Sequence, residues 1–197
     1  MAVRFIRRRV HLVYRYTAAT PELRDLPASL AYHRLDRASA LAFFGRRDED
    51  RRRLRQYLRL LERGCIGSLI ADGDTWAAVG WISHPGSITP PHLSRRVIGN
   101  NAVWAFLAYT HPEYRKRGLQ KAGLIYRVRL AREAVADDDA PVHSDVSPRN
   151  LPSRRAQLRC GFEPAGRIHY ASTSIPRVHK WTWGTWNSGE VHPPLEW

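Results

Sequence analysis

Residues Tyr114–Ala122 read YRKRGLQKA and form the most informative stretch of the chain. It lies between a strand-like run, Ala102–Tyr109, and a helix-like run, Leu119–Ala136. Such a turn is suited to holding phosphate groups, because the free N–H groups and the dipole at the start of a helix favour an anion. Gly118 allows main-chain angles that a side chain forbids and lets an anion approach closely. A solvated basic helix start is the alternative interpretation, since the surrounding cations are Arg115, Lys116, Arg117 and Lys121.

A second motif follows at a spacing that fits the first. Asn150-Leu-Pro-Ser153 opens another helix, and Gly161-Phe162 closes it. The 32 residues from Gly118 to Asn150 (150 − 118) leave room for a helix, a loop and one strand. With both motifs in this order, the chain resembles the GNAT superfamily of acyl-CoA N-acyltransferases. That family has an Arg/Gln-x-x-Gly-x-Gly/Ala loop, here Arg115–Gln120, and an Asn-x-x-Ser/Ala helix, here Asn150–Ser153.

The resemblance implies an α/β (α+β) GNAT fold, with a mixed, mostly antiparallel central sheet of about seven strands flanked by about four helices. We expect one GNAT-like domain over residues 1–183 and a C-terminal tail over residues 184–197. Sequence patterns predict strands at Arg9–Tyr16, Cys65–Ala71, Thr75–Ile82, Ala102–Tyr109, Val142–Val146, Arg167–Ser174 and Val178–Trp183. They predict helices at Pro21–Gly45, Asp48–Arg63, Leu119–Ala136 and Pro152–Cys160.

The charge of the chain narrows the class of partner. The sequence has 197 residues and a net charge of +14, from 32 Lys and Arg against 18 Asp and Glu. A positive surface attracts phosphates, acidic carrier proteins or nucleic acid, and it disfavours polycationic substrates such as aminoglycosides. An Arg-rich proteome alone would produce the same excess.

Cysteine content and hydropathy indicate the compartment. The two cysteines, Cys65 and Cys160, give neither a disulfide framework nor a metal cluster. No apolar run approaches the ~20 residues that span a bilayer, and the first residues lack the pattern of a secretory signal. We therefore expect a cytoplasmic protein, a monomer or homodimer, without a metal site or a membrane partner.

The resemblance also implies a cosubstrate, acetyl-CoA or another acyl-CoA. Main-chain N–H groups after residue 115 would bind its pyrophosphate, and the strand before the loop would pair with the pantetheine arm. A main-chain N–H in that strand would polarise the acyl carbonyl. Gln120 departs from the family's Gly or Ala, and its side chain would either crowd the pyrophosphate or turn into solvent. The implied CoA-binding residues are Ala108, Tyr109, Thr110, Arg115, Lys116, Arg117, Gly118, Leu119, Gln120, Lys121, Asn150 and Ser153.

Transfer to an amine requires a base, because an amine is protonated at neutral pH. Asp145 lies near the end of a predicted strand, at a position where related enzymes often have a base, and His143 shares its sheet face. The other role open to Asp145 is capping the following turn. His111 is a second candidate base, with a solvent-exposed turn histidine as the alternative.

The general acid that protonates the leaving thiolate is the second catalytic group that the resemblance implies. Many family members have Tyr where this chain has Gln157, and a Gln has no proton to give at physiological pH. Tyr170 and Tyr126 are the substitutes we consider, although a thiolate with a pKa near ~8.5 does not strictly need an acid.

The leading functional prediction is an N-acyltransferase that moves an acetyl or other acyl group from acyl-CoA to a primary amine by direct attack in a ternary complex. The charge favours a small amine on an anionic scaffold as the acceptor. Two alternatives stay open at this point. One is an acyltransferase that acts on tRNA-linked amines or is fed by an acyl carrier protein, and the other is a non-catalytic module that binds acyl-CoA.

Overall fold

The structure is a computed structural model that describes residues 5–46, 48–175 and 178–195. One sheet contains eight strands in the order β2-β3-β4-β5-β6-β1-β7-β8. The strands are β1 (Phe5–Tyr16), β2 (Leu30–Leu35), β3 (Ile66–Asp72), β4 (Thr75–Ser83), β5 (Val103–Thr110), β6 (Val142–Val146), β7 (Glu163–Ile175) and β8 (Val178–Asn187). The α-helices in the described residues are α1 (Arg37–Phe44), α2 (Arg51–Glu62), the single turn α3 (Arg95–Ile98), α4 (Leu119–Val135) and α5 (Leu151–Arg159).

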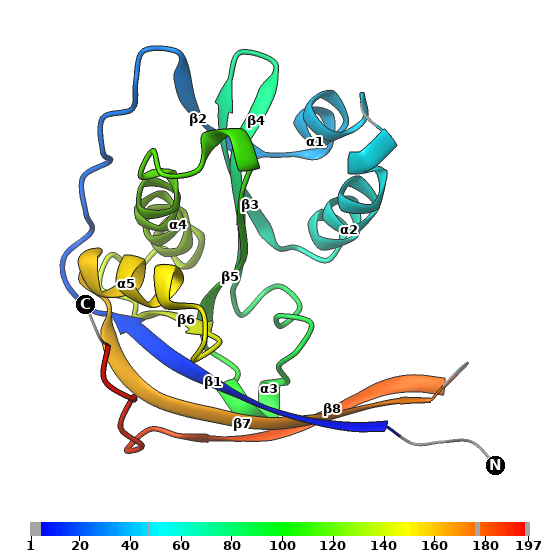
Figure 1. Ribbon diagram of the computed structural model, residues 1–197, viewed down its shortest axis with the longest axis vertical. Helices are drawn as coiled ribbons and strands as arrows, with labels where there is room; N and C mark the ends of the chain where they lie inside the picture. Colours follow the sequence, from blue (N-terminus) through cyan, green and yellow to red (C-terminus); the bar gives the residue numbers. More distant parts are fainter. Residues whose placement is uncertain (1–4, 47, 176–177, 196–197) are drawn as a thin grey trace.

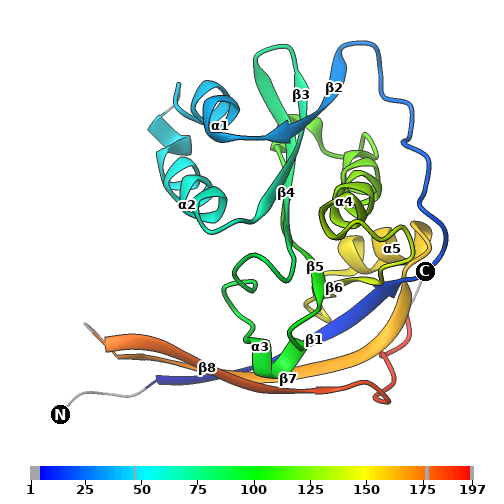
Figure 2. The same cartoon turned by 180° about the vertical axis from the view of Figure 1, so that it is seen from behind.

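The helices cover both faces of the sheet. α4 and α5 lie on one face and α1 and α2 on the other, while β1, β7 and β8 extend as a long curved ribbon across one end (Figures 1 and 2). β5 and β6 are parallel neighbours, whereas the other neighbouring strands pair antiparallel. The predicted mixed, mostly antiparallel sheet is therefore confirmed, with eight strands in place of about seven. No helix in the described ranges is long and apolar enough to cross a membrane.

Alternation along the strands divides the core between the two faces. In β5, Trp104 packs in the core beneath α1 and α2, whereas Ala105 belongs to the core beneath α4. In β1, Val13 belongs to the core beneath α1 and α2, and Leu12 belongs to the core beneath α4. This division determines which side chains of a strand can reach a given face.

The helix predicted at Pro21–Gly45 is wrong. Leu30–Leu35 instead forms the edge strand β2, paired antiparallel with β3, and only Arg37–Phe44 is helical. Asp36 begins that helix, because its side chain accepts a hydrogen bond from the Ser39 N–H at 2.7 Å. The first and last residues of β2, Leu30 and Leu35, are buried. The pairing of β2 with the buried strand β3 therefore outweighs the helical propensity of this segment.

β5 and β6 separate partway along their length. They pair only over Val103–Ala105 and Val142–Ser144, although β5 continues to Thr110 beside β4. Leu107 has a φ of 48°, and the β4–β5 register shifts between Val79 and Trp81, so β5 carries a bulge just beyond the last paired residue. We call the opening between β5 and β6 the fork.

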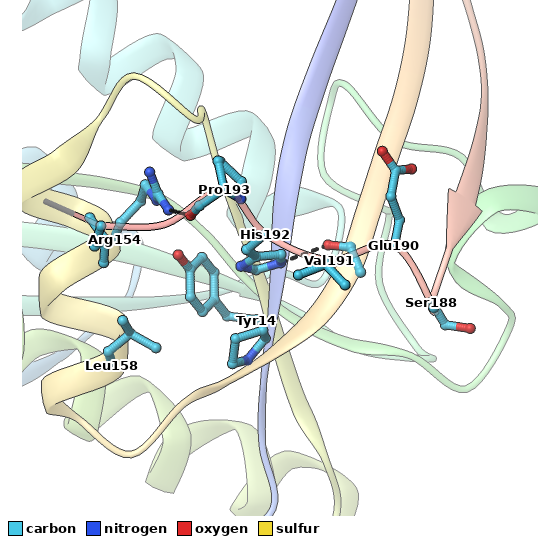
Figure 3. Close-up of a pocket in the computed structure, with 12 residues that line it drawn as sticks. Tyr14, Arg154, Leu158, Ser188, Glu190, Val191, His192 and Pro193 are labelled. Atoms are coloured by element: carbon cyan, nitrogen blue, oxygen red, sulfur yellow. Dashed lines mark hydrogen bonds between the residues drawn. The ribbon is translucent and has the colours of Figure 1, made fainter.

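The residues after β8 return along β7 and α5. β8 runs to Asn187, beyond the predicted strand end at Trp183, and residues Ser188–Leu195 then form what we call the C-terminal strap. Arg154 of α5 donates a hydrogen bond to the Pro193 carbonyl (Figure 3). The His192 Nε2 lies 2.8 Å from the Gly166 carbonyl oxygen, and the His192 ring packs edge-on against Tyr14 with its centroid 4.8 Å away.

Truncation after Asn187 is expected to lower the free energy of unfolding by about 2–4 kcal/mol, because several hydrogen bonds worth about 1 kcal/mol each are lost. Urea unfolding of the full and truncated chains measures the difference. The control is Val191→Ser, whose side chain is 79% exposed and whose substitution should change stability by less than about 0.5 kcal/mol. Equal stability of the truncated and full chains would show that the strap contributes nothing.

Candidate active site

A cavity of about 770 Å³ opens between α4, α5 and strands β3 to β5. Ten of the twelve residues expected to bind CoA line it: Ala108, Tyr109, Thr110, Arg115, Lys116, Gly118, Leu119, Gln120, Lys121 and Asn150. Arg117 and Ser153 are not part of the lining. Residues from two motifs 32 positions apart (150 − 118) therefore meet at one pocket, which we call the α4–α5 pocket.

The loop before α4 is shaped for an anion. Lys116 and Gly118 both have positive φ, at 65° and 76°. Helical hydrogen bonding begins with the Lys121 N–H, which donates to the Gly118 carbonyl at 3.0 Å. The N–H groups that precede it in the first turn have no helical acceptor and carry the positive end of the helix dipole. A negatively charged group at this loop would be stabilised by both features.

The pocket lining is strongly cationic. Among the described residues it includes Arg115, Lys116, Lys121, Arg127, Arg155 and Arg159, and no Asp or Glu. The cations come from the loop, from α4 and from α5. Their combined field favours a ligand with several negative charges.

Gln120 takes a position that neither sequence alternative described. Its side-chain amide donates a hydrogen bond to the Ser153 hydroxyl at 3.0 Å, so it connects the start of α4 to the start of α5. Asn150 begins α5, with its side-chain oxygen 3.3 Å from the Ser153 N–H. Ser153 thus supports the pocket wall from behind without lining the pocket.

A second group of side chains gathers at the fork, on the face beneath α1 and α2. The Asp145 carboxylate accepts hydrogen bonds from Trp104 Nε1 at 2.7 Å, from His92 Nε2 at 2.8 Å and from His11 Nδ1. The Tyr170 hydroxyl lies 3.2 Å from His11 Nε2. We call these five residues the fork network. Asp145 and Tyr170 were predicted separately as base and acid, and His11 joins them.

The chemistry of the network fixes its proton positions. The carboxylate of Asp145 can only accept, so both imidazoles donate to it. In the neutral ring, His11 Nε2 then accepts the hydrogen bond from Tyr170. Burial would raise the pKa of Asp145, but the hydrogen bonds and charge of His11 and His92 outweigh it and lower that pKa below its usual range. Burial raises the pKa of Tyr170, so its hydroxyl stays protonated at neutral pH.

Strand β5 links the fork network to the α4–α5 pocket, although none of the five network residues lines that pocket. Asp145 follows Ser144, the last β6 residue paired with β5, so its carboxylate lies where the two strands part. The pocket reaches β5 at Ala108, just past the bulge at Leu107. A ligand that extends from the Gly118 loop along β5 would meet the network at the fork.

Other predicted residues lie apart from this network. The His111 side chain is 12% exposed and packs edge-on against Trp76, with ring centroids 4.6 Å apart, at the opposite end of β5 from Trp104. His111 and Trp104 are seven positions apart along the strand (111 − 104), which is roughly 20 Å. Tyr126 contacts Tyr32, and Gln157 is buried with its Oε1 unpartnered. The structure therefore does not bring His111 or Tyr126 to the fork.

The sequence expectation of no metal site stays a prediction. In the described part of the chain, His11, His92 and Asp145 bring three potential ligand atoms within 4.8 Å of one another. Histidine and carboxylate ligands suit a divalent ion such as Zn²⁺. Binding of such an ion would require both imidazoles to give up the protons that they share with Asp145.

His143 makes the stability of the fold depend on pH. It stacks on Trp104 with ring centroids 5.4 Å apart, and burial, followed by the charge of Arg15, lowers its pKa to about 4. The unfolded chain takes up the proton near pH 6.5, so stability is complete above that pH and is lost as pH falls toward 4. We expect a loss of about 3 kcal/mol over this range. Urea unfolding at pH 7.5 and pH 4.5 should show that His143→Phe loses less than the wild type, and an identical loss would contradict the assignment.

The fold of this chain is similar to that of several solved structures. No protein-family model and no curated protein sequence matches the chain. Among solved structures, a tandem GNAT protein from the clavulanic acid biosynthesis pathway superposes with a TM-score of 0.58 at 13% identity, over 87% of this chain. The aminoglycoside N-acetyltransferase AAC(6′)-Iy in complex with CoA superposes with a TM-score of 0.51 at 16% identity, over 68% of this chain and 88% of its own.

The chain has the GNAT fold. A Drosophila protein is similar to the same extent, with a TM-score of 0.58 at 15% identity over 88% of this chain. This chain spans about half of two of these structures, 53% of the Drosophila protein and 55% of the tandem GNAT protein. At these identities the likeness establishes the GNAT architecture, and the chemistry has to be argued from the residues of this chain.

Proposed function

We propose that this protein is an N-acyltransferase that uses acetyl-CoA or another acyl-CoA and a primary amine. The observation that carries the proposal is the α4–α5 pocket, where the Gly118 loop and six cations gather beside β5, the strand that parts from β6 at the fork. The pyrophosphate of CoA would bind the main-chain N–H groups after Lys116, and the pantetheine arm would run along Ala108–Thr110. The thioester would then lie at the fork beside the bulge at Leu107.

The fork network supplies the proton chemistry of this proposal. The ammonium group of the acceptor first gives one proton to water; the neutral nitrogen then attacks the thioester carbon, a C–N bond forms, and the C–S bond breaks with its electron pair on sulfur. The amine proton passes to the Tyr170 oxygen while the Tyr170 proton moves to His11 Nε2, 3.2 Å away. The side chain of Asp145 is 2% exposed, so in this proposal it orients and stabilises His11 and does not contact the amine. The thiolate leaves and takes up a proton from water.

A second cavity suggests where an acceptor binds. It has a volume of about 650 Å³ and lies between α2 and the loop that carries His92. Arg52, Arg59 and Arg63 line it, and no acidic residue does so in the part of the chain that the structure describes. These residues favour a small amine attached to an anionic group, delivered to the face of the sheet that bears the fork network.

The test is acyl transfer by purified protein, measured as free thiol released from acetyl-CoA and longer acyl-CoAs with a panel of neutral and anionic amines. Amine-dependent thiol release would support the proposal. Tight CoA binding without turnover on any amine would favour a non-catalytic binding module, and absence of CoA binding would overturn the proposal. Binding of tRNA at low salt that weakens steeply as salt rises would favour the RNA-linked alternative.

A further inference from the structure

Arg127 is a buried cation with no anionic partner among the residues that the structure describes. It lies on the inner face of α4, it is 4% exposed, and it lines the α4–α5 pocket. Its Nε has no hydrogen-bond partner, and no carboxylate of the described residues forms an ion pair with it. Burial lowers its pKa to about 10, and the nearby Cys160 acts in the opposite direction.

Such an arrangement is costly for the ligand-free protein. A guanidinium removed from water loses its hydration, and it normally regains that energy from a carboxylate or phosphate. The fold makes room for it, because Gly80 of β4 lies under the guanidinium and a Cβ atom at that position would collide with Arg127 Nη1. The guanidinium of Arg127 therefore packs against Gly80 of β4, and any residue larger than glycine at that position would displace it.

The position of Arg127 separates it from the phosphate loop. It lies nine residues after Gly118 along α4 (127 − 118), which is about 13 Å of helix. Gly80 lies between Val79, the partner of Tyr109, and Trp81, the partner of Phe106, so it faces the bulge of β5. Arg127 is thus at the fork end of the pocket, where the proposed function places the thioester.

We propose that Arg127 binds a carboxylate at the far end of the acyl group, so that the preferred donor is the CoA thioester of a dicarboxylic acid such as succinate. This inference rests on the proposed function and specifies its donor. A carboxylate there would form a charge-assisted pair with a planar guanidinium that already faces the pocket. An anionic group on the acceptor is the other candidate partner for Arg127. Such a group would have to reach the guanidinium from the opposite face of the sheet.

The experiment compares two donors of equal chain length, succinyl-CoA and butyryl-CoA, in wild type and in Arg127→Met. We expect the wild type to bind succinyl-CoA at least about tenfold more tightly, and the ratio of the two dissociation constants to fall at least about tenfold in the variant. Gly80→Ala, which displaces the guanidinium, is expected to shift the ratio in the same direction. Circular dichroism and thermal unfolding establish that each variant is folded.

Each outcome bears on the inference. A wild type that binds butyryl-CoA as tightly as succinyl-CoA would overturn it, as would a ratio that Arg127→Met leaves unchanged. Free CoA is titrated in parallel, because its binding tests the proposed function alone. If free CoA binds and the ratio does not depend on Arg127, only the donor assignment fails. If free CoA does not bind to the wild type, both proposals fail.

Discussion

Replacing Gly118 by Asp is expected to weaken CoA binding at least about 100-fold, or about 2.7 kcal/mol. Gly118 has a φ of 76°, a conformation that costs an L-residue about 1–2 kcal/mol. The new carboxylate would also stand where the pyrophosphate is expected and repel it. Calorimetric titration with CoA measures the change in dissociation constant.

A matched control separates backbone strain from the local repulsion. Gly73 in the β3–β4 turn has a φ of 50°, and a Cβ atom there would meet nothing within 4 Å, as at Gly118. Gly73→Asp therefore introduces the same charge and the same type of strain away from the pocket. We expect its CoA affinity to stay within about twofold of the wild type. Equal losses of CoA affinity in both variants would contradict a role for the Gly118 loop in binding the pyrophosphate.

Replacing His11 by Gln is expected to lower kcat about 100- to 1000-fold, because general acid–base catalysis contributes effects of that size. Gln cannot take up the proton that leaves Tyr170, although it can fill the same space. Since His11 lies outside the α4–α5 pocket lining, the dissociation constant for CoA should change little. Steady-state kinetics with the best acceptor, combined with the CoA titration, separates the two quantities.

The control for His11 is His169→Gln. His169 is on β7 next to Tyr170, but its imidazole is 44% exposed and pairs with Glu190 at 2.7 Å, outside the fork network. We expect it to retain full kcat. A decrease of less than threefold in His11→Gln would contradict the proton path. Turnover that is abolished by EDTA and restored by Zn²⁺ would instead assign His11, His92 and Asp145 to a metal site.

The parts of the fold and site predicted from sequence are those encoded locally. The turn around Gly118, the long helix that follows it and the Asn150 helix start each depend on neighbouring residues, and the structure brings the first and last of them to one pocket. Gly161 was expected to end α5, and it has a φ of 84° directly after the Cys160 cap.

The parts that were missed depend on long-range pairing. His11 contacts Asp145, 134 residues away, because β1 pairs with β6, and His92 reaches it from an irregular loop. No hydrophobic period or motif spacing in the sequence indicates that residues so far apart are in contact. The alternation of β1 could have indicated that His11 and Val13 share a face, which places His11 inside. The predicted helix at Pro21–Gly45 failed for a related reason, because β2 is stabilised by its partner β3.

A crystal structure of the protein with CoA would show directly whether the α4–α5 pocket binds the acyl donor. We expect the pyrophosphate within hydrogen-bond distance of the main-chain N–H groups between Lys116 and Lys121, and the sulfur at the fork beside Ala108. CoA bound outside the pocket between α4 and α5, or bound there with its sulfur pointing away from the fork, would contradict it.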